Sequence, residues 1–293
     1  MTTTTPTLPA TPVRARFRGS TPGFVLGLVL IGGIVVLSLA APLLFPQGYD
    51  IQDLTARGLP PTWFGEHPLG TDHLGRDYLA RLAYGGRTLL LLSTFAVLVS
   101  TVIGIGLALT SVLAGTWLEV LVDRLADVQL ALPSILVGIV VLALLGPSNP
   151  TLVLVLSVSS WVLTFRIVRA HARTLLHRPY IDACRLAGGS TRDIVTRHLL
   201  PNTLPLVLVS ASLNFAAIVL LLSGFGFIGL GVQPPAPDWG QLVAAGQAQL
   251  ANHWWLSILP GLLLVALLVG IQLVSDHLST RFAVTSLEGN RLT

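Results

Sequence analysis

Residues 198–237 read HLLPNTLPLVLVSASLNFAAIVLLLSGFGFIGLGVQPPAP, a run of 40 residues without a single Asp, Glu, Lys or Arg. Similar runs of 31 residues lie at 19–49 and 88–118, one of 38 lies at 128–165, and one of 37 lies at 239–275. A helix needs about 20 apolar residues to cross a hydrocarbon core about 30 Å thick. The runs therefore predict an all-α, polytopic membrane protein that resides in the lipid bilayer.

The overall composition leads to the same class. Of the 293 residues, 53% are hydrophobic and 10% charged, and the mean hydropathy is +0.78, whereas a soluble domain has about 25% charged residues. A net charge of +4 would suggest a nucleic-acid ligand in a soluble protein. Here the arginines lie near the expected membrane boundaries, so no nucleic-acid partner is expected.

Six membrane-spanning helices are expected. The 38-residue run is divided by residues 146–150 (GPSNP), whose prolines, glycine and asparagine are typical of a turn. The first span could also be a signal peptide, but its 22 apolar residues are longer than the usual apolar region and favour an uncleaved helix. The six spans are placed at 24–45, 89–114, 128–145, 151–165, within 204–230 and within 256–275.

The distribution of arginine predicts the orientation. Residues 166–198 contain seven Arg against two Asp, and the N-terminal tail contains three Arg and no acid. Cytoplasmic loops carry the excess of basic residues, so both termini are expected in the cytoplasm. Residues 115–127 fit poorly, because this cytoplasmic loop would hold Glu119, Asp123 and Asp127 against Arg124.

One cytoplasmic segment carries a recognisable motif. Residues 180–190 (YIDACRLAGGS), followed by residues 197–202 (RHLLPN), resemble the "EAA" signature of ABC importer permeases, with Asp182 in place of Glu and Cys184 in place of Ala. A short helix with an acid and small residues can sit in a groove of another protein. Gly188 and Gly189 permit a sharp reversal, and Pro201 is expected where the chain turns back into the bilayer. A helix that only rests on the membrane surface is the alternative.

Three further blocks resemble the dipeptide, oligopeptide and nickel "C-type" permeases of the same family. They are residues 67–77 (HPLGTDHLGRD), residues 84–89 (YGGRTL) and residues 227–240 (FIGLGVQPPAPDWG). With the EAA segment they occur in the family's order and cover nearly the whole chain after residue 20. The resemblance implies a type I (MetI-like) permease fold with six transmembrane helices.

The resemblance also implies partners and site residues. It implies a heterodimer with a homologous permease, two cytoplasmic ATPases that bind the ATP and Mg, an extracytoplasmic substrate-binding protein and the bacterial inner membrane. The implied ATPase-coupling residues are Tyr180, Asp182, Ala183, Cys184, Gly188, Gly189, His198 and Pro201. The residues of the extracytoplasmic family motif are His67, Gly70, Asp72, Gly75, Arg76 and Asp77.

The absence of ionisable residues from the spans, and of lysine from the chain, indicates the source of energy. Ionisable residues inside a span normally mark ion or proton paths, and none is expected inside these spans. All 17 basic residues are Arg, so no Walker A lysine is present and the ATPase must be a separate chain. The chain is thus expected to transport without catalysing a reaction, to bind no cofactor itself, and to admit di- or oligopeptides.

Several alternatives stay open. A nickel or glutathione importer shares these motifs, and an ion-coupled secondary transporter or a membrane scaffold would belong to different classes. The spacing of His67, Asp72, His73 and Asp77 matches no established metal site, so no metal is expected. An uncharged path could be lined by polar span residues, although such groups also hydrogen-bond between helices. The candidates for the path are Ser210, Ser212, Asn214 and Ser223.

The chain divides into four expected parts. Residues 1–20 form a cytoplasmic tail, and residues 21–88 form the first span with an extracytoplasmic segment. Residues 89–280 form the core permease domain, with the EAA coupling loop at about 166–201, and residues 281–293 form a cytoplasmic tail.

Overall fold

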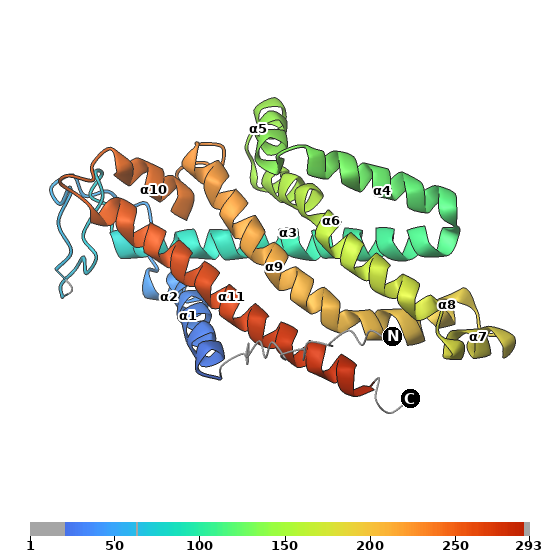
Figure 1. The fold of residues 1–293 in the computed structure, drawn as a ribbon. Helices are drawn as coiled ribbons and strands as arrows, with labels where there is room; N and C mark the ends of the chain where they lie inside the picture. The colour runs from blue at the N-terminus through green and yellow to red at the C-terminus, as the bar shows by residue number, and fades with distance from the viewer. Residues whose placement is uncertain (1–20, 63, 290–293) are drawn as a thin grey trace, which may run out of the picture.

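The computed structural model describes residues 21–62 and 64–289, with side chains from residue 22 to residue 280 except residue 63. Five described helices are long and apolar enough to cross a membrane, and a bent pair of helices makes a sixth candidate span. The described residues thus form the expected all-α, polytopic fold (Figure 1). The N-terminal tail of the sequence-based division, and part of its C-terminal tail, lie outside the described residues.

The N-terminal helices are α1 (Thr21–Leu39) and the short α2 (Ala41–Leu44), followed by an irregular segment at 45–77. Helix α1 packs against the last helix, where a Cβ on Gly27 would lie 2.9 Å from the carbonyl oxygen of Gly270. Helix α3 (Tyr78–Ala114) then begins eleven residues earlier than expected. At 1.5 Å per residue, its 37 residues extend about 55 Å, which exceeds a bilayer core. The expected domain boundary at 88/89 therefore falls inside α3, and the domain division stays a prediction.

The third expected span, at 128–145, is wrong as a single helix. Helix α4 (Thr116–Ala131) and helix α5 (Ser134–Leu145) meet at an angle of 89°. Pro133 lies at the break, where its ring and its missing N–H prevent continuation of the helix. With only 12 residues, α5 is about 18 Å long and cannot cross a bilayer core by itself.

Helix α6 (Asn149–Leu176) is longer than the expected span at 151–165. It packs along α3, and a Cβ on Gly104 of α3 would lie 2.9 Å from the carbonyl oxygen of Trp161. Beyond it come α7 (Pro179–Leu186), α8 (Thr191–Asp193), a π-helical turn (Ile194–Leu199) and α9 (Leu200–Phe227). The last three join into one continuous helical span at 191–227.

The chain ends with α10 (Trp239–Gln247) and α11 (Trp255–Gly289). Figure 1 shows α10 and the 45–77 segment at one end of the long helices and α7 and α8 at the opposite end. One apolar cluster joins α1, α3, α5, α6, α9, α10 and α11, and a second, near the other end, joins α3, α4, α6, α7, the π-helical turn and α9. The two ends are consequently built around separate cores.

Candidate functional site

Helix α7 keeps most of its side chains exposed. Ile181 is its only buried residue and packs into the second apolar cluster. Leu186, by contrast, is 90% exposed, and Asp182 makes only an exposed ion pair with Arg185 at 3.4 Å. The ring of Tyr180 lies 5.6 Å from that of His198. Helix α7 is thus held by Ile181 and, one turn on, by the partly buried Cys184, and it presents an exposed face with a leucine that the sequence motif did not single out.

Gly188 and Gly189 reverse the chain after α7, as expected. Gly188 has φ +83°, a left-handed conformation that glycine adopts without a Cβ penalty. The N–H of Gly189 donates to the carbonyl of Cys184 at 2.9 Å, and a Cβ on Gly189 would lie 2.5 Å from the Cys184 Sγ. Ser190 then caps the next helix in a reciprocal pair with Asp193. The two glycines therefore act differently, one through its backbone angle and the other through close contact.

Pro201 does not turn the chain, contrary to expectation. It lies in the first turn of α9, inside the continuous helix at 191–227. Proline cannot donate a backbone hydrogen bond and its ring crowds the carbonyl four residues earlier. Just before it, the N–H of Leu200 donates to Val195, five residues back, in the π-helical turn. The wider turn accommodates the proline, and the reversal is made by the glycines.

The acids that fitted the topology poorly form a ladder of ion pairs with the arginines of α6. Glu119 and Asp123 of α4 flank Arg169, whose Nε lies 2.9 Å from Glu119 Oε1. Arg173 Nε also lies 2.8 Å from Glu119 Oε1, and Arg166 Nη2 lies 2.7 Å from Asp127 Oδ1. The acidic residues at 119–127 are explained by this pairing, because α4 supplies the counter-charges for the arginines of α6. The ladder ties α4 to the helix that leads directly into α7.

Glu119 is the most buried acid of the ladder, with 11% of its side chain exposed. We expect Glu119→Gln to lower the free energy of unfolding by about 2–3 kcal/mol, because Arg169 and Arg173 lose a partly buried counter-charge. Thermal unfolding of the purified protein in nanodiscs measures this loss. Asp182→Asn is the control, since its exposed pair should contribute less than about 1 kcal/mol. Equal losses in both variants would contradict a structural role for the ladder.

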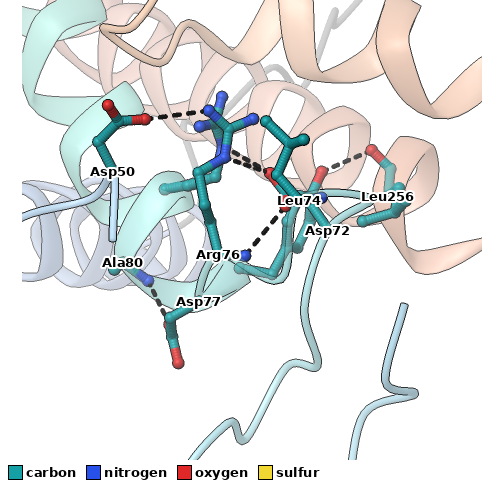
Figure 2. A network of polar contacts seen from close by, with 9 residues as sticks. Asp50, Asp72, Leu74, Arg76, Asp77, Ala80 and Leu256 are labelled. Atoms are coloured by element: carbon teal, nitrogen blue, oxygen red, sulfur yellow. Dashed lines mark hydrogen bonds and ion pairs between the residues drawn. The ribbon is translucent and has the colours of Figure 1, made fainter. Parts of the chain in front are cut away.

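The extracytoplasmic motif folds into a polar network at the start of α3 (Figure 2). Asp72 Oδ1 accepts the backbone N–H groups of Leu74 at 2.8 Å and Arg76 at 3.0 Å, and its Oδ2 accepts Arg76 Nε at 2.7 Å. Arg76 Nη1 also lies 3.1 Å from Asp50 Oδ1. Asp77 caps α3 by accepting the N–H of Ala80. These motif residues hold the 45–77 segment against the long helix.

His67, Gly70 and Gly75 complete this network. His67 Nδ1 lies 2.8 Å from Asp77 Oδ2. Gly70 and Gly75 both have positive φ, and a Cβ on either would overlap the backbone of residues 53–61. All six motif residues are therefore brought together, and each has a structural part in the 45–77 segment. His73, although in the same turn, is exposed.

The four candidates for the translocation path lie mainly between helices. Asn214 Nδ2 donates to the carbonyl of Ser160 at 3.0 Å and lies 3.2 Å from Thr164 Oγ1, both on α6. Ser210 Oγ is 3.4 Å from the same threonine, and Ser212 bonds Ser275 on α11. Ser223 is buried without a hydrogen-bond partner among the described residues. Three of the four thus make interhelical hydrogen bonds, and their role in a path stays a prediction.

The block at 227–240 packs the α9–α10 connection onto α3. Trp239 is buried, donates its indole N–H to the carbonyl of Leu82 at 2.8 Å, and covers Gly85 and Gly86. Asp238 is 1% exposed, and this burial raises its pKa to about 7. Its carboxylate lies beside Gly226, where a Cβ would overlap it. Nothing in the sequence block at 227–240 distinguished Asp238 as a buried acid.

Comparison with known proteins identifies the family. The model of the family described as "Binding-protein-dependent transport system inner membrane component" matches residues 100–284. The chain belongs to this permease family. A second model, described as the N-terminal TM domain of oligopeptide transport permease C, matches residues 13–61 of the permease.

Curated relatives match most of the permease. It is 36% identical over 256 residues to the di/tripeptide transport system permease protein DppC of Pseudomonas aeruginosa, covering 86% of this chain and 84% of the relative. It is 32% identical over 254 residues to the dipeptide permease DppC of Alkalihalophilus pseudofirmus, covering 87% and 83%. The DppC protein of Haemophilus influenzae is 36% identical over 265 residues, with coverage of 87% and 88%.

Solved structures agree on the fold. A chain of the MetNI methionine ABC transporter, solved in inward-facing conformations, superposes with a TM-score of 0.56 at 20% identity, covering 67% of the permease and 93% of that chain. The expected type I (MetI-like) permease fold is therefore confirmed. Membership of a binding-protein-dependent family also favours an importer permease over an ion-coupled transporter, and it places the multi-pass chain in the inner membrane of a bacterial ABC importer.

Proposed function

We propose that this permease carries di- and oligopeptides inward across the bacterial inner membrane, paired with a homologous second permease. The observation that carries the substrate class is the set of relatives at 32–36% identity, all named as dipeptide or di/tripeptide permeases and matched over most of the chain. A separate binding protein would deliver the peptide at the end formed by α10 and residues 45–77. Both termini would lie in the cytoplasm.

Two cytoplasmic ATPases would supply the energy, binding ATP and Mg outside this chain. The exposed face of α7 supports this role, since a helix anchored on one side by Ile181 and Cys184 can receive a partner on the other side without disturbing the core. Because α6 continues toward α7 and is paired to α4 through Glu119 and Arg169, a push on α7 would move both helices. The permease itself would then perform no covalent chemistry.

Reconstituted transport tests this proposal. The full complex in proteoliposomes should take up labelled dialanine when ATP, Mg and the binding protein are present, and vanadate should stop the uptake. Uptake that follows an imposed proton gradient without ATP would contradict the proposal. Uptake of nickel or glutathione in preference to dialanine would overturn the substrate class and leave the ATP-driven mechanism in place.

A further inference from the structure

A cavity of about 270 Å³ lies at the end of the molecule opposite α7, between the start of α3 and helix α10. One wall comes from the polar network of Asp72 and Arg76, with Tyr78 and Arg81 of α3. The other wall is formed by Pro234 and Pro235, by residues of α10 and by Leu256 of α11. His73 and Ala245 also line it and are exposed, so the cavity opens to the surface there. Its size suits a small ligand.

Arg81 is the unusual group in this cavity. Only 6% of its side chain is exposed, yet its Nε and Nη1 atoms have no hydrogen-bond partner among the described residues. Its one described ionic neighbour is Asp72 Oδ2, at 3.5 Å from Nε, which is too long and poorly aligned for a hydrogen bond. A guanidinium group has five N–H donors. Arg81 therefore lines the cavity with a guanidinium group whose donors are largely unused by the described residues, while its Nε and Nη1 atoms are themselves covered.

Asp72 does not satisfy Arg81, and three of the about four acceptor sites of its carboxylate are already used. Its oxygens accept two backbone N–H groups and Arg76 Nε (Figure 2). Asp50 contacts Arg76, and Asp72 is the one described acid beside Arg81. Together the two aspartates balance the charges of Arg76 and Arg81. Arg81 thus has a counter-charge, but its buried donors lack hydrogen-bond acceptors, which is unfavourable.

We propose that this cavity binds a monovalent carboxylate through Arg81. A carboxylate matches the planar fork of a guanidinium group and can accept hydrogen bonds from Arg81 that Asp72 does not accept. The adjacent Asp72 repels any anion, and it repels a dianionic phosphate more strongly than a monovalent carboxylate. The apolar side chains of Leu242 and Leu256 leave room for a small hydrophobic portion of the ligand.

The α-carboxylate of a peptide is the ligand assigned to this site, an assignment that rests on the proposed peptide transport. The cavity lies at the end where the binding protein would deliver its cargo, and it opens to the surface. Arg81 would hold the carboxyl end of the peptide at the entrance, while the side chains of the peptide remain free. Such a contact recognises a feature common to all peptides and so tolerates varied sequences.

Binding of small probes to the full complex in nanodiscs, without the binding protein, tests the site. Saturation-transfer NMR should detect dialanine, and acetate should compete with it, whereas dialanine amide should not bind. Arg81→Gln should weaken dialanine binding about tenfold or more, because one charge-assisted pair is lost. Arg87→Gln, on the same helix but away from the cavity, is the matched control and should bind normally.

A second variant tests the site even if Arg81→Gln does not fold. Ala245→Leu narrows the exposed mouth without touching Arg81 and should also weaken binding. Equal affinity for dialanine and its amide, or unchanged binding in both Arg81→Gln and Ala245→Leu, would overturn the site. Binding of acetate but not dialanine would overturn the peptide assignment.

The two proposals fail in distinguishable ways. ATP-driven uptake of dialanine together with unchanged binding in the Arg81 and Ala245 variants would refute only the carboxylate site. Arg81-dependent binding of acetate in a complex that transports no peptide would refute the proposed substrate and retain the carboxylate site.

Discussion

Replacing Leu186 with Asp is expected to reduce ATP-driven uptake by at least about tenfold while the permease remains folded in the membrane. Leu186 is 90% exposed at the end of α7, so the change disturbs no packing within the chain. If α7 docks on an ATPase, the new carboxylate becomes buried without a partner, and this costs about 2 kcal/mol or more. Uptake by proteoliposomes and co-purification of the ATPases measure the effect.

Leu186→Met provides the matched control for this substitution. Methionine keeps an apolar side chain of similar volume, so uptake and ATPase binding should stay close to those of the wild type. Full uptake by the Asp variant would show that this face of α7 makes no functional contact. Loss of the folded permease in the Asp variant alone would show that Leu186 has a structural role.

Replacing Gly75 with Ala is expected to destabilise the end of the protein that holds residues 45–77 by about 2–5 kcal/mol. Gly75 has φ +73°, and its new Cβ would overlap the backbone carbonyl of Asp53. The left-handed conformation costs a residue with a Cβ about 1–2 kcal/mol, and overpacking adds about 1–3 kcal/mol. Thermal unfolding in nanodiscs and the amount of permease in membranes measure the loss.

Gly48→Ala separates the two causes of this loss. Gly48 also has a positive φ, +91°, but a Cβ there would meet no atom within 4 Å. Only the backbone cost of about 1–2 kcal/mol should remain. Equal losses in the two variants would show that contact with Asp53 contributes nothing.

The sequence predicted the membrane fold well because the signal is physical and local. A long run without charged residues, such as 198–237, is most stable inside a bilayer. The GPSNP turn correctly separated α5 from α6. The glycines after α7 were also predicted, since few other residues reverse a chain so tightly. Pro133 is the sequence signal for the break in the third span, because proline interrupts a helix.

The sequence by itself thus determined that the chain is a helical permease, where most spans lie and where the chain reverses after the 180–190 motif. Only the tertiary structure decided what the charges do. It paired Glu119 with arginines 50 and 54 residues away, and it left donors of Arg81 without hydrogen-bond acceptors beside a cavity walled by α10 and α11. The reason is that a charge is balanced by neighbours in space, and these lie on helices whose packing no local pattern specifies.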